Sequence, residues 1–452
     1  MRLLRSRTTI WLLVLLLTTL SACGGEGGEG DDPTTTVDTT AGDNGTTTTP
    51  APDSDTTAPS EPVEITWMLF WNTSGRDALG EPLVEKFNQE HPNIRVEVIS
   101  VPFGEFKERA ISLHAADQTP DVITPQPDMI RDFVELGILQ PLDSFLDADP
   151  EYAASLAAGA LLPVEGAQYH VPTVIIPTGM FYNITMLEEA GVTIPDSWDW
   201  ENLQEAMEAV NDPASGRYAT ALALCESVSA NVSTQVFPFI FGAGGQLVDD
   251  SGKAALDSPE VLQAAEYYMN IAENYTVPGI LSECLADNLG HFVSETTAFH
   301  FQNTGAVGVL RSENPELDWG FASVEGPAGR EGIRLTSWNL GMGSTTEHAD
   351  AAWTFIKWLT TTGNSEIGQV GGNIPANADA ASDSWITDDP IMQVAASLAS
   401  DPNAVLTDVL MPAPSQMYLA LQTQLQEVIS GNKTLEEALA TANEEWNALL
   451  NE

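Results

Sequence analysis

Aromatic and planar polar side chains occur together directly after two predicted strands. Trp71 and Asn72 follow a buried strand predicted over residues 65–70, and Gln126 and Asp128 follow a short one at residues 122–123. An aromatic face can cover the C–H surface of a sugar ring, while amide and carboxylate groups can share its hydroxyls. These residue types therefore favour non-covalent binding of a polar, ring-shaped solute.

Covalent and metal chemistry has little support in the sequence. The six histidines are scattered without the spacing of metal ligands, and Gly-x-Ser-x-Gly, P-loop and Cys-x-x-Cys motifs are absent. In so acidic a chain, the number of carboxylates alone does not indicate the catalytic pair of a glycosidase. We expect no metal, no cofactor and no catalytic residue. A surface-anchored glycosidase is the alternative from another functional class.

The charge balance restricts the possible partners. The 452 residues include 65 acidic and 16 basic side chains, which gives a formal net charge of -49. Such a field repels phosphate backbones, so we expect no nucleic-acid partner, and it disfavours an anionic ligand. The simplest interpretation of the acidic composition is that it keeps the protein soluble in a salty habitat, where counterions screen the repulsion.

The N-terminus has the pattern of an export signal. Three arginines within the first seven residues precede an apolar run, residues 10–20, that is too short to cross a bilayer comfortably. The following Leu20-Ser21-Ala22-Cys23 resembles the lipobox of bacterial lipoproteins, which implies removal of residues 1–22 and lipidation of Cys23. We expect a protein outside the cytoplasm that is lipid-anchored to the cell membrane. A plain secreted protein is the alternative.

The composition changes after Cys23. Residues 24–62 are mainly Gly, Thr, Asp, Glu and Pro, and have almost no large apolar side chain. Such a segment cannot bury a core, so residues 23–62 are predicted to be a disordered, lipidated tether. In an exported protein, the two remaining cysteines, Cys225 and Cys284, are predicted to form a disulfide. Two buried free thiols are the alternative.

The elements after the tether predict the fold class. Strand patterns at residues 65–70, 94–98 and 122–123 alternate with helical patterns, the first of which opens at Pro82. This alternation predicts a mostly parallel sheet with helices on both faces. Ligands of such sheets bind beyond the carboxyl ends of the strands. We expect Trp71, Asn72, Gln126 and Asp128 to lie there.

Residues 169–183 have the character of a joint between two domains. The segment is apolar and β-branched, but Pro172 and Pro177 remove backbone donors that an ordinary central strand would use. We interpret it as a hinge, with residues 319–325 as the second passage between the domains.

Several short segments resemble one family. They are FNQEHPNI at residues 87–94, PDV at 120–122, LGILQPLD at 136–143 and AWTFIKWL at 352–359, and their order and spacing extend over about residues 62–452. Together they resemble the extracellular solute-binding proteins of the maltose-binding type, which deliver ligands to ABC importers. The resemblance implies a two-lobe α/β fold of the periplasmic-binding-protein type II, with a hinge and an interlobe cleft.

The resemblance also gives domain boundaries. The N-terminal lobe is predicted to comprise residues 63–175 and about 326–380, and the C-terminal lobe residues 176–325 and about 381–452.

Further cleft candidates follow from the resemblance. Segments of the family that correspond to Gln302-Asn303 and to Trp338-Asn339 commonly face the ligand, and Glu226 and Tyr418 complete the set. Family members that bind maltodextrins often have an acidic residue and more aromatics near the hinge, where this chain has Ile175 and Ile176. The resemblance therefore favours a smaller or different glycoside.

The expected function is capture of a mono-, di- or short oligosaccharide by a monomer, with delivery to the permease subunits of an importer through hinge closure. The alternative on the same fold is a cationic or zwitterionic solute, which the negative field would attract.

Overall fold

The computed structural model describes residues 61–71, 77–157, 161–225, 230–408 and 411–451. The elements of the first part are β1 (Val63–Trp71), α1 (Asp77–Glu90), β2 (Ile94–Pro102), α2 (Phe106–Ala115), β3 (Val122–Ile123), α3 (Pro127–Glu135), β4 (Leu139–Gln140), α4 (Asp143–Ala148), α5 (Pro150–Ser155) and β5 (His170–Asn183). The middle part contains α6 (Ile184–Glu189), β6 (Trp198–Asp199), α7 (Trp200–Val210), β7 (Tyr218–Thr220), α8 (Ala230–Gln235), α9 (Phe237–Gly242), α10 (Pro259–Asn274), α11 (Leu285–Val293), β8 (Thr297–Asn303), α12 (Val307–Glu313), β9 (Trp319–Ala322) and β10 (Val324–Glu325). The last part contains β11 (Arg334–Gly343), α13 (Ala349–Leu359), α14 (Asn364–Gly371), β12 (Ile374–Pro375), α15 (Ser384–Thr387), α16 (Pro390–Ala399), β13 (Val405–Leu406), α17 (Pro414–Ile429) and α18 (Leu435–Leu450).

The first three strands form the parallel sheet that their alternation with helices predicts. β1 pairs in parallel with β2 and with β3, and β11 then adds to β3 in the antiparallel sense. The predicted start of the first helix is wrong by about one turn, because α1 begins at Asp77 and continues through Pro82. Pro82 is the sixth residue of α1, beyond the first turn, so α1 lacks the hydrogen bond that an N–H at this position would donate to the carbonyl of residue 78.

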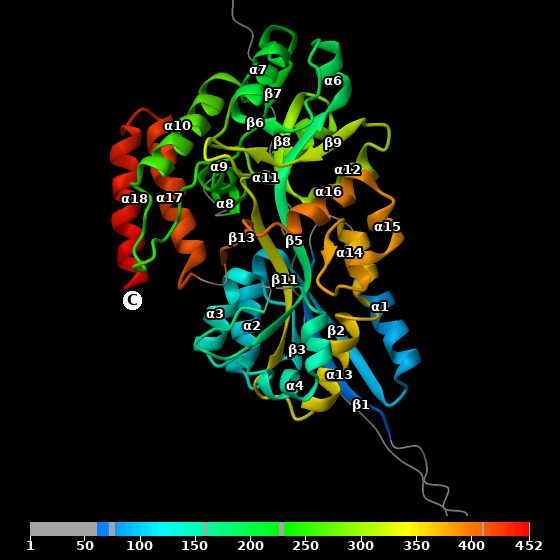
Figure 1. The fold of residues 1–452 in the computed structure, drawn as a ribbon. Coiled ribbons are helices and arrows are strands. Elements are labelled where there is room, and N and C mark those ends of the chain that lie inside the picture. Colours follow the sequence, from blue (N-terminus) through cyan, green and yellow to red (C-terminus); the bar gives the residue numbers. More distant parts are fainter. Residues whose placement is uncertain (1–60, 72–76, 158–160, 226–229, 409–410, 452) are drawn as a thin grey trace, which may run out of the picture. The chain divides into compact units, whose positions relative to one another are not determined.

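Helices cover both faces of this first sheet (Figure 1). Side chains at alternate positions of β1 point to opposite faces, as strand geometry requires. Ile65, Trp67 and Leu69 pack with α1 and α13, whereas Met68 and Phe70 pack with α2 and α3. The predicted α/β class with a doubly covered sheet is confirmed.

β5 connects this sheet to a second one. Its first half, residues 170–177, pairs with β11, and its second half, residues 178–183, pairs with β8 and β9. Met180 and Phe181 begin two further cores on opposite faces, one with α7, α9 and α10 and the other with α11, α12 and α16. The chain therefore has two lobes, and β5 is the strand that they share (Figure 1).

The prolines of β5 coincide with an irregularity in its pairing. The β5–β11 register shifts between Trp338 and Asn339, so that Thr173 has no partner residue on β11. The carbonyl of Thr173 instead accepts hydrogen bonds from Asn364 Nδ2 at 2.7 Å and from the Ala376 amide at 2.9 Å. β5 is therefore central along its length, but it contains a bulge next to Pro172.

The predicted second passage is displaced in the structure. Residues 319–325 form β9 and β10, which pair with the second half of β5 and with β6, so they lie within the second lobe. β11 makes the passage back, because it begins opposite Pro177 and ends beside β3. The sequence of β9 and β10 predicts strands but not their partners. Only the pairing with β5 and β6 shows that these strands stay within the second lobe.

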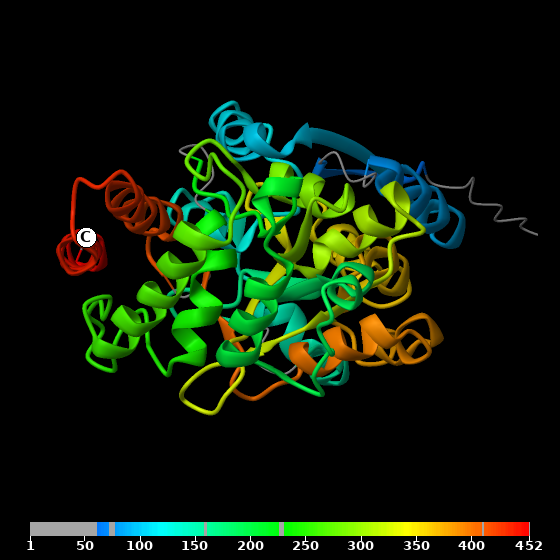
Figure 2. The same cartoon turned by 90° about the horizontal axis from the view of Figure 1, so that it is seen from above.

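The C-terminal helices complete the second lobe. Leu421 and Leu425 of α17 and Leu439 and Trp446 of α18 lie in the same core as the helices α7, α9 and α10. In both views α17 and α18 lie side by side at one edge (Figure 1, Figure 2).

Candidate functional site

The junction between the lobes is defined by the middle of β5. Thr178 is the first residue of β5 that pairs with β8, and its partner is Asn303. Pro177 is paired with Leu335 at the start of β11, and the same β11 residues pair with β13.

Of the three candidates Trp71, Asn72 and Glu226, the structure describes only the place of Trp71 in its strand. Trp71 is the last residue of β1, at the carboxyl end where the sheet rule places it. Asn72 and Glu226 lie outside the described residues.

Asp128 connects the first lobe to the C-terminal helices. It lies in the first turn of α3, which begins at Pro127, and its Oδ2 accepts a hydrogen bond of 2.6 Å from Ser415 Oγ in α17. Desolvation raises the pKa of Asp128, although the hydrogen bond from Ser415 opposes this shift. Gln126 precedes α3, is half-buried, and has an extended backbone whose side chain makes no helix-capping bond.

Trp338 lies beside the end of β1. It is half-buried on β11, and its ring meets Phe70 edge to face with centroids 5.6 Å apart. Its carbonyl accepts a hydrogen bond of 3.2 Å from Thr173 Oγ1, across the bulge. The ring is therefore fixed between the end of β1 and the shared strand.

Asn339 points into the protein. It is fully buried, its Oδ1 lies 2.9 Å from His170 Nδ1, and its Nδ2 donates to Ser337 Oγ at 3.1 Å. Burial lowers the pKa of His170 to about 4, so the imidazole is neutral at pH 7. Asn339 thus has internal partners for both of its functional atoms, and we do not keep it as a ligand contact.

Tyr418 is also internal. Its hydroxyl donates to Asp408 Oδ1 at 2.5 Å, and its ring meets Phe237 edge to face at 5.0 Å, with only 3% of the residue exposed. The aromatic face expected to cover a ligand is thus covered by protein.

Tyr418 belongs to a buried network that the sequence analysis missed. Asp408 Oδ2 accepts hydrogen bonds from Arg334 Nη2 at 2.5 Å and from Thr336 Oγ1 at 3.1 Å. Burial by itself would raise the pKa of Asp408, but the Arg334 guanidinium and the Tyr418 hydrogen bond hold it below its usual value. The negative charge of Asp408 further raises the pKa of Asp128, so the two carboxylates are close enough to interact electrostatically. The only hint in the sequence is that Arg334 is one of few basic residues.

Gln302 and Asn303 lie at the junction end of β8. Both are half-buried, and Asn303 Oδ1 accepts a hydrogen bond of 3.0 Å from the Gly305 amide. Gln302 Oε1 accepts a bond of 3.2 Å from the Asn303 amide. The next residue, Thr304, bonds through Oγ1 to Asn373 Oδ1 at 3.0 Å and so ties this strand end to the turn after α14.

The segment that leads to Glu226 is held by a disulfide. Cys225 and Cys284 are bonded, with Cα atoms 5.2 Å apart, and Cys284 immediately precedes α11. The carbonyl of Cys225 accepts a hydrogen bond of 2.6 Å from Gln422 Nε2 in α17. The disulfide and α17 together hold Cys225 in place.

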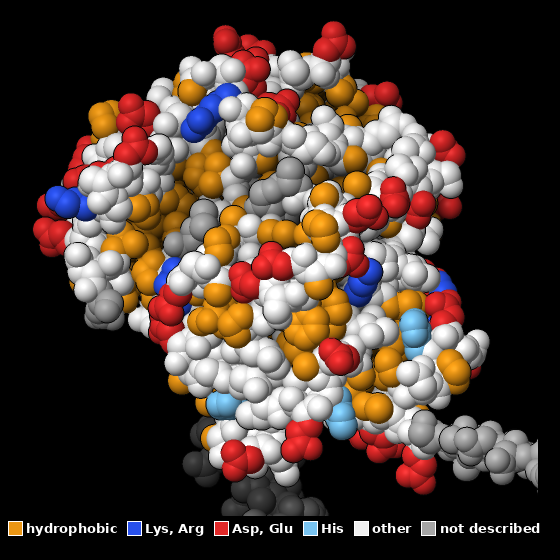
Figure 3. All heavy atoms as spheres, turned by 60° about the horizontal axis from the view of Figure 1, so that its bottom comes forward, with side chains coloured by type: hydrophobic (Ala, Val, Ile, Leu, Met, Phe, Trp, Pro, Cys, Tyr) orange, Lys and Arg blue, Asp and Glu red, His pale blue; other side chains and the backbone are white. Residues whose placement is uncertain are grey.

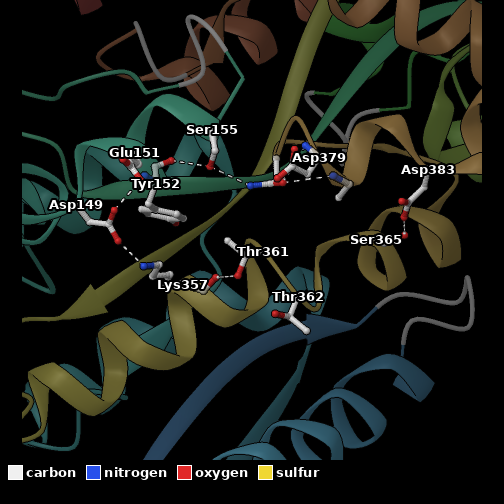
Figure 4. Close-up of a pocket in the computed structure, with 12 residues that line it drawn as sticks. Asp149, Glu151, Tyr152, Ser155, Lys357, Thr361, Thr362, Ser365, Asp379 and Asp383 are labelled. Carbon is white, nitrogen blue, oxygen red and sulfur yellow. Dashed lines mark hydrogen bonds and ion pairs between the residues drawn. The ribbon is translucent and has the colours of Figure 1, made fainter.

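A separate, wide recess of about 560 Å³ lies on the first lobe, between α5, the end of α13 and the chain after β12 (Figure 4). Its polar groups are largely paired with one another: Lys357 binds Asp149, Asn377 Nδ2 donates to Ser155 Oγ at 3.0 Å, and Ser365 binds Asp383. It lies away from the strand ends, and we do not assign the ligand site to it.

Acidic side chains are the most frequent charged groups on the face shown in Figure 3. On this face, they are spread widely, lysines and arginines are few, and hydrophobic side chains gather in a hollow. Within the described ranges, no three His, Cys, Asp or Glu residues are arranged to hold a metal ion. In the same part of the chain, none of the helices combines the length and apolarity that a membrane crossing needs.

Comparisons with known proteins point to one family. Residues 72–366 match the model of the bacterial extracellular solute-binding proteins. YcjN of Escherichia coli strain K12, named as an ABC transporter periplasmic-binding protein, is 26% identical over 307 residues, which are 67% of this chain and 70% of that one. The maltotriose-binding protein of Pyrococcus abyssi is 25% identical over 291 residues, 61% of this chain and 59% of its own.

The fold is similar to that of solved structures. An ABC transporter solute-binding protein from Thermotoga lettingae, solved with bound α-D-tagatose, superposes with a TM-score of 0.76. The match covers 86% of this chain and all of that one at 22% identity, so it shows the shared two-lobe fold.

Proposed function

The chain belongs to the family of bacterial extracellular solute-binding proteins, of the maltose-binding type, and on that basis we propose that it captures a carbohydrate between its lobes and delivers it to an ABC importer. The ligand we propose is a mono-, di- or short oligosaccharide. No bond of the ligand is made or broken, and the protein acts as a monomer.

One observation supports the proposal: the candidate ligand groups of both lobes belong to strands and strand ends that lead toward the point where β5 passes from one sheet into the other. Trp338, Gln126 and Asp128 approach this junction from the first sheet, and Gln302 and Asn303 approach it from β8. An aromatic face together with amides and a carboxylate matches the two kinds of surface that a sugar presents. The maltotriose-binding relative supports the same ligand class.

Capture is coupled to closure through the shared strands. Within the described residues, β5 and β11 pass the junction, and the chain passes it again through β12 between α13 in the first core and α16 in the core of Phe181, so small backbone rotations where these segments cross turn one lobe against the other. A ligand that contacts both lobes stabilises the closed arrangement, which the importer then recognises.

The ligand class is tested by thermal shift and calorimetry. Purified protein is screened against mono- and oligosaccharides, polyamines and betaines, because a ligand that binds only the folded state raises Tm. We expect a sugar to give the largest shift, and Trp338→Ala to weaken its binding at least tenfold. Trp200→Ala is the matched control, since Trp200 is half-buried on α7 and stacks on Tyr267 in the second lobe. Equal affinities of the two variants would remove Trp338 from the site.

A cationic or zwitterionic solute is the second candidate, favoured by the net charge of -49 and by the carboxylates of Asp128 and Asp408 in one region. The polyamine and betaine members of the screen address it. A shift with these compounds alone would replace the carbohydrate, and hydrolysis of any sugar would instead indicate a glycosidase.

We further propose that Cys23 is lipidated and that residues 24–62 tether the folded body to the membrane; residues 1–60 lie outside the described part of the chain. Expression of a Cys23→Ala variant should release the protein into the soluble extracytoplasmic fraction. Retention of this variant in the membrane fraction would contradict the lipid anchor.

A further inference from the structure

A small apolar recess adjoins Trp338. It measures about 40 Å³, is partly open, and is lined by Trp67, Leu69, Phe70, Leu83, Thr124, Thr173, Trp338, Leu340, Leu359 and Ile367. Leu69 and Phe70 are near the end of β1, and Thr124 follows β3 directly. Leu83, Leu359 and Ile367 belong to the core between this sheet and α1, α13 and α14, so the recess extends from that core to the carboxyl ends of two parallel strands, beyond which sheets of this kind bind ligands.

The few polar groups around the recess are already used. Thr124 Oγ1 accepts a hydrogen bond of 2.8 Å from Trp67 Nε1, and Thr173 Oγ1 donates to the Trp338 carbonyl at 3.2 Å. A buried water needs two to four polar partners, so water would be held poorly in this space. An apolar group has no such requirement.

The size of the recess limits what can enter it. One water needs roughly 10–15 Å³ by this measure, so about 40 Å³ has room for about three non-hydrogen atoms. The surrounding side chains are otherwise well packed, with Leu83 and Leu359 fully buried. Protein interiors contain few voids larger than a water molecule, and leaving one unfilled is unfavourable. A ligand group that fills the recess would regain those contacts.

We propose that this recess is a subsite for an apolar substituent of the bound sugar, such as the methyl group of a 6-deoxyhexose or of an O-methyl glycoside. The inference rests on the proposed function: the sugar ring lies against Trp338, and its substituent enters between Trp338 and Thr124. A hydroxymethyl group would fit the same space, but its hydroxyl would lose its water partners without gaining new ones.

Matched sugar pairs test the subsite. Calorimetry compares L-fucose with L-galactose, L-rhamnose with L-mannose, and methyl glycosides with the free sugars. We expect the apolar member of at least one pair to bind about tenfold more tightly, the range found for one methylene in a hydrophobic pocket. Ile367→Phe fills the recess and should reduce that preference to about twofold or less while the polar member still binds.

Controls separate a filled subsite from a damaged core. Leu83→Phe fills the recess from α1 instead of α14 and serves if Ile367→Phe does not fold, as judged by circular dichroism. Ile386→Phe enlarges a buried side chain in another core and should leave the preference unchanged. Sugar binding without any preference for apolar substituents, or a preference that survives both filling variants, overturns the subsite but leaves the proposed function standing. If no sugar binds, the proposed function itself fails, and the subsite fails with it.

Discussion

At the scale of single residues, the region between the lobes is held together by buried polar groups that are paired with one another. Arg334 and Asp408 form an ion pair in which each side chain is only 6% exposed, and Asp408 also accepts from Tyr418 and two threonines. A buried ion pair adds little net stability, but removing one partner leaves an uncompensated charge. The pair therefore constrains where β11 and the chain before α17 can lie.

Asp408→Asn should reduce the free energy of unfolding by about 3–5 kcal/mol, because Arg334 then stays buried without its counter-charge. Urea unfolding at pH 7 measures the change. Glu189→Gln is the control, since its pair with Arg217 is exposed and should contribute less than about 1 kcal/mol. Similar losses in both variants would contradict a special role for the buried pair.

His300 predicts a pH dependence. It is 1% exposed between Phe181 and Phe292, and burial lowers its pKa from 6.5 to about 3. Between those pH values the unfolded chain binds a proton that the folded chain does not, so stability is complete above about pH 6.5 and falls as the pH decreases. The slope is up to about 1.4 kcal/mol per pH unit, and His170 adds a similar term down to about pH 4.

His300→Phe should reduce the loss of stability between pH 6.5 and 5 by about half, because it removes one of the two buried titrating rings, leaves His170, and keeps an aromatic between Phe181 and Phe292. The free energy of unfolding is measured at both pH values. The exposed His348→Gln serves as control and should leave the slope unchanged. An unaltered slope in His300→Phe would show that this ring is protonated in the folded state.

At the scale of elements, the start of β11 is fixed by the turn that precedes it. Residues 326–332 pack against the backbone of α9, and Arg330 Nε donates to the Phe241 carbonyl at 2.6 Å. A Cβ atom on Gly332 would lie 1.8 Å from the Pro238 carbonyl oxygen, a separation that real Cβ atoms do not adopt. The close approach holds the turn to the second lobe, so the hinge bending that we propose would be confined to residues that follow it.

Gly332→Ala should lower stability by roughly 2 kcal/mol or more, because the turn must move away from α9. Thermal unfolding measures the loss. In Gly104→Ala the new methyl group meets no atom within 4 Å, so this variant should be close to neutral. A stable Gly332→Ala variant would mean that the turn is not a fixed anchor.

At the scale of the whole molecule, the dominant property is the acidic charge. With 65 acidic and 16 basic side chains, repulsion opposes the compact state, and salt screens this repulsion. The described ion pairs are too few to balance the carboxylates, so stability must depend on the ionic strength.

Raising NaCl from about 0.01 to 1 M, where the screening length falls from about 30 to 3 Å, should increase Tm. Differential scanning calorimetry at constant pH records the change, and KCl at equal ionic strength is the control. Equal shifts in the two salts indicate screening, whereas a shift confined to one cation would indicate a specific ion site instead.

The sequence by itself determined the elements and their class. The alternation of strands and helices, the ends of β1 at Trp71 and of β3 at Ile123, and the strand β5 that links the two sheets were all visible locally, because side-chain periodicity and proline placement are properties of neighbouring residues. The tertiary structure decided which candidates face inward. Asn339 meets His170 across 169 residues, Arg334 meets Asp408 across 74, and Asp128 meets Ser415 across 287. Such partners, like the displaced passage at β11 and the recess beside Trp338, arise from packing between distant segments, and no local pattern records them.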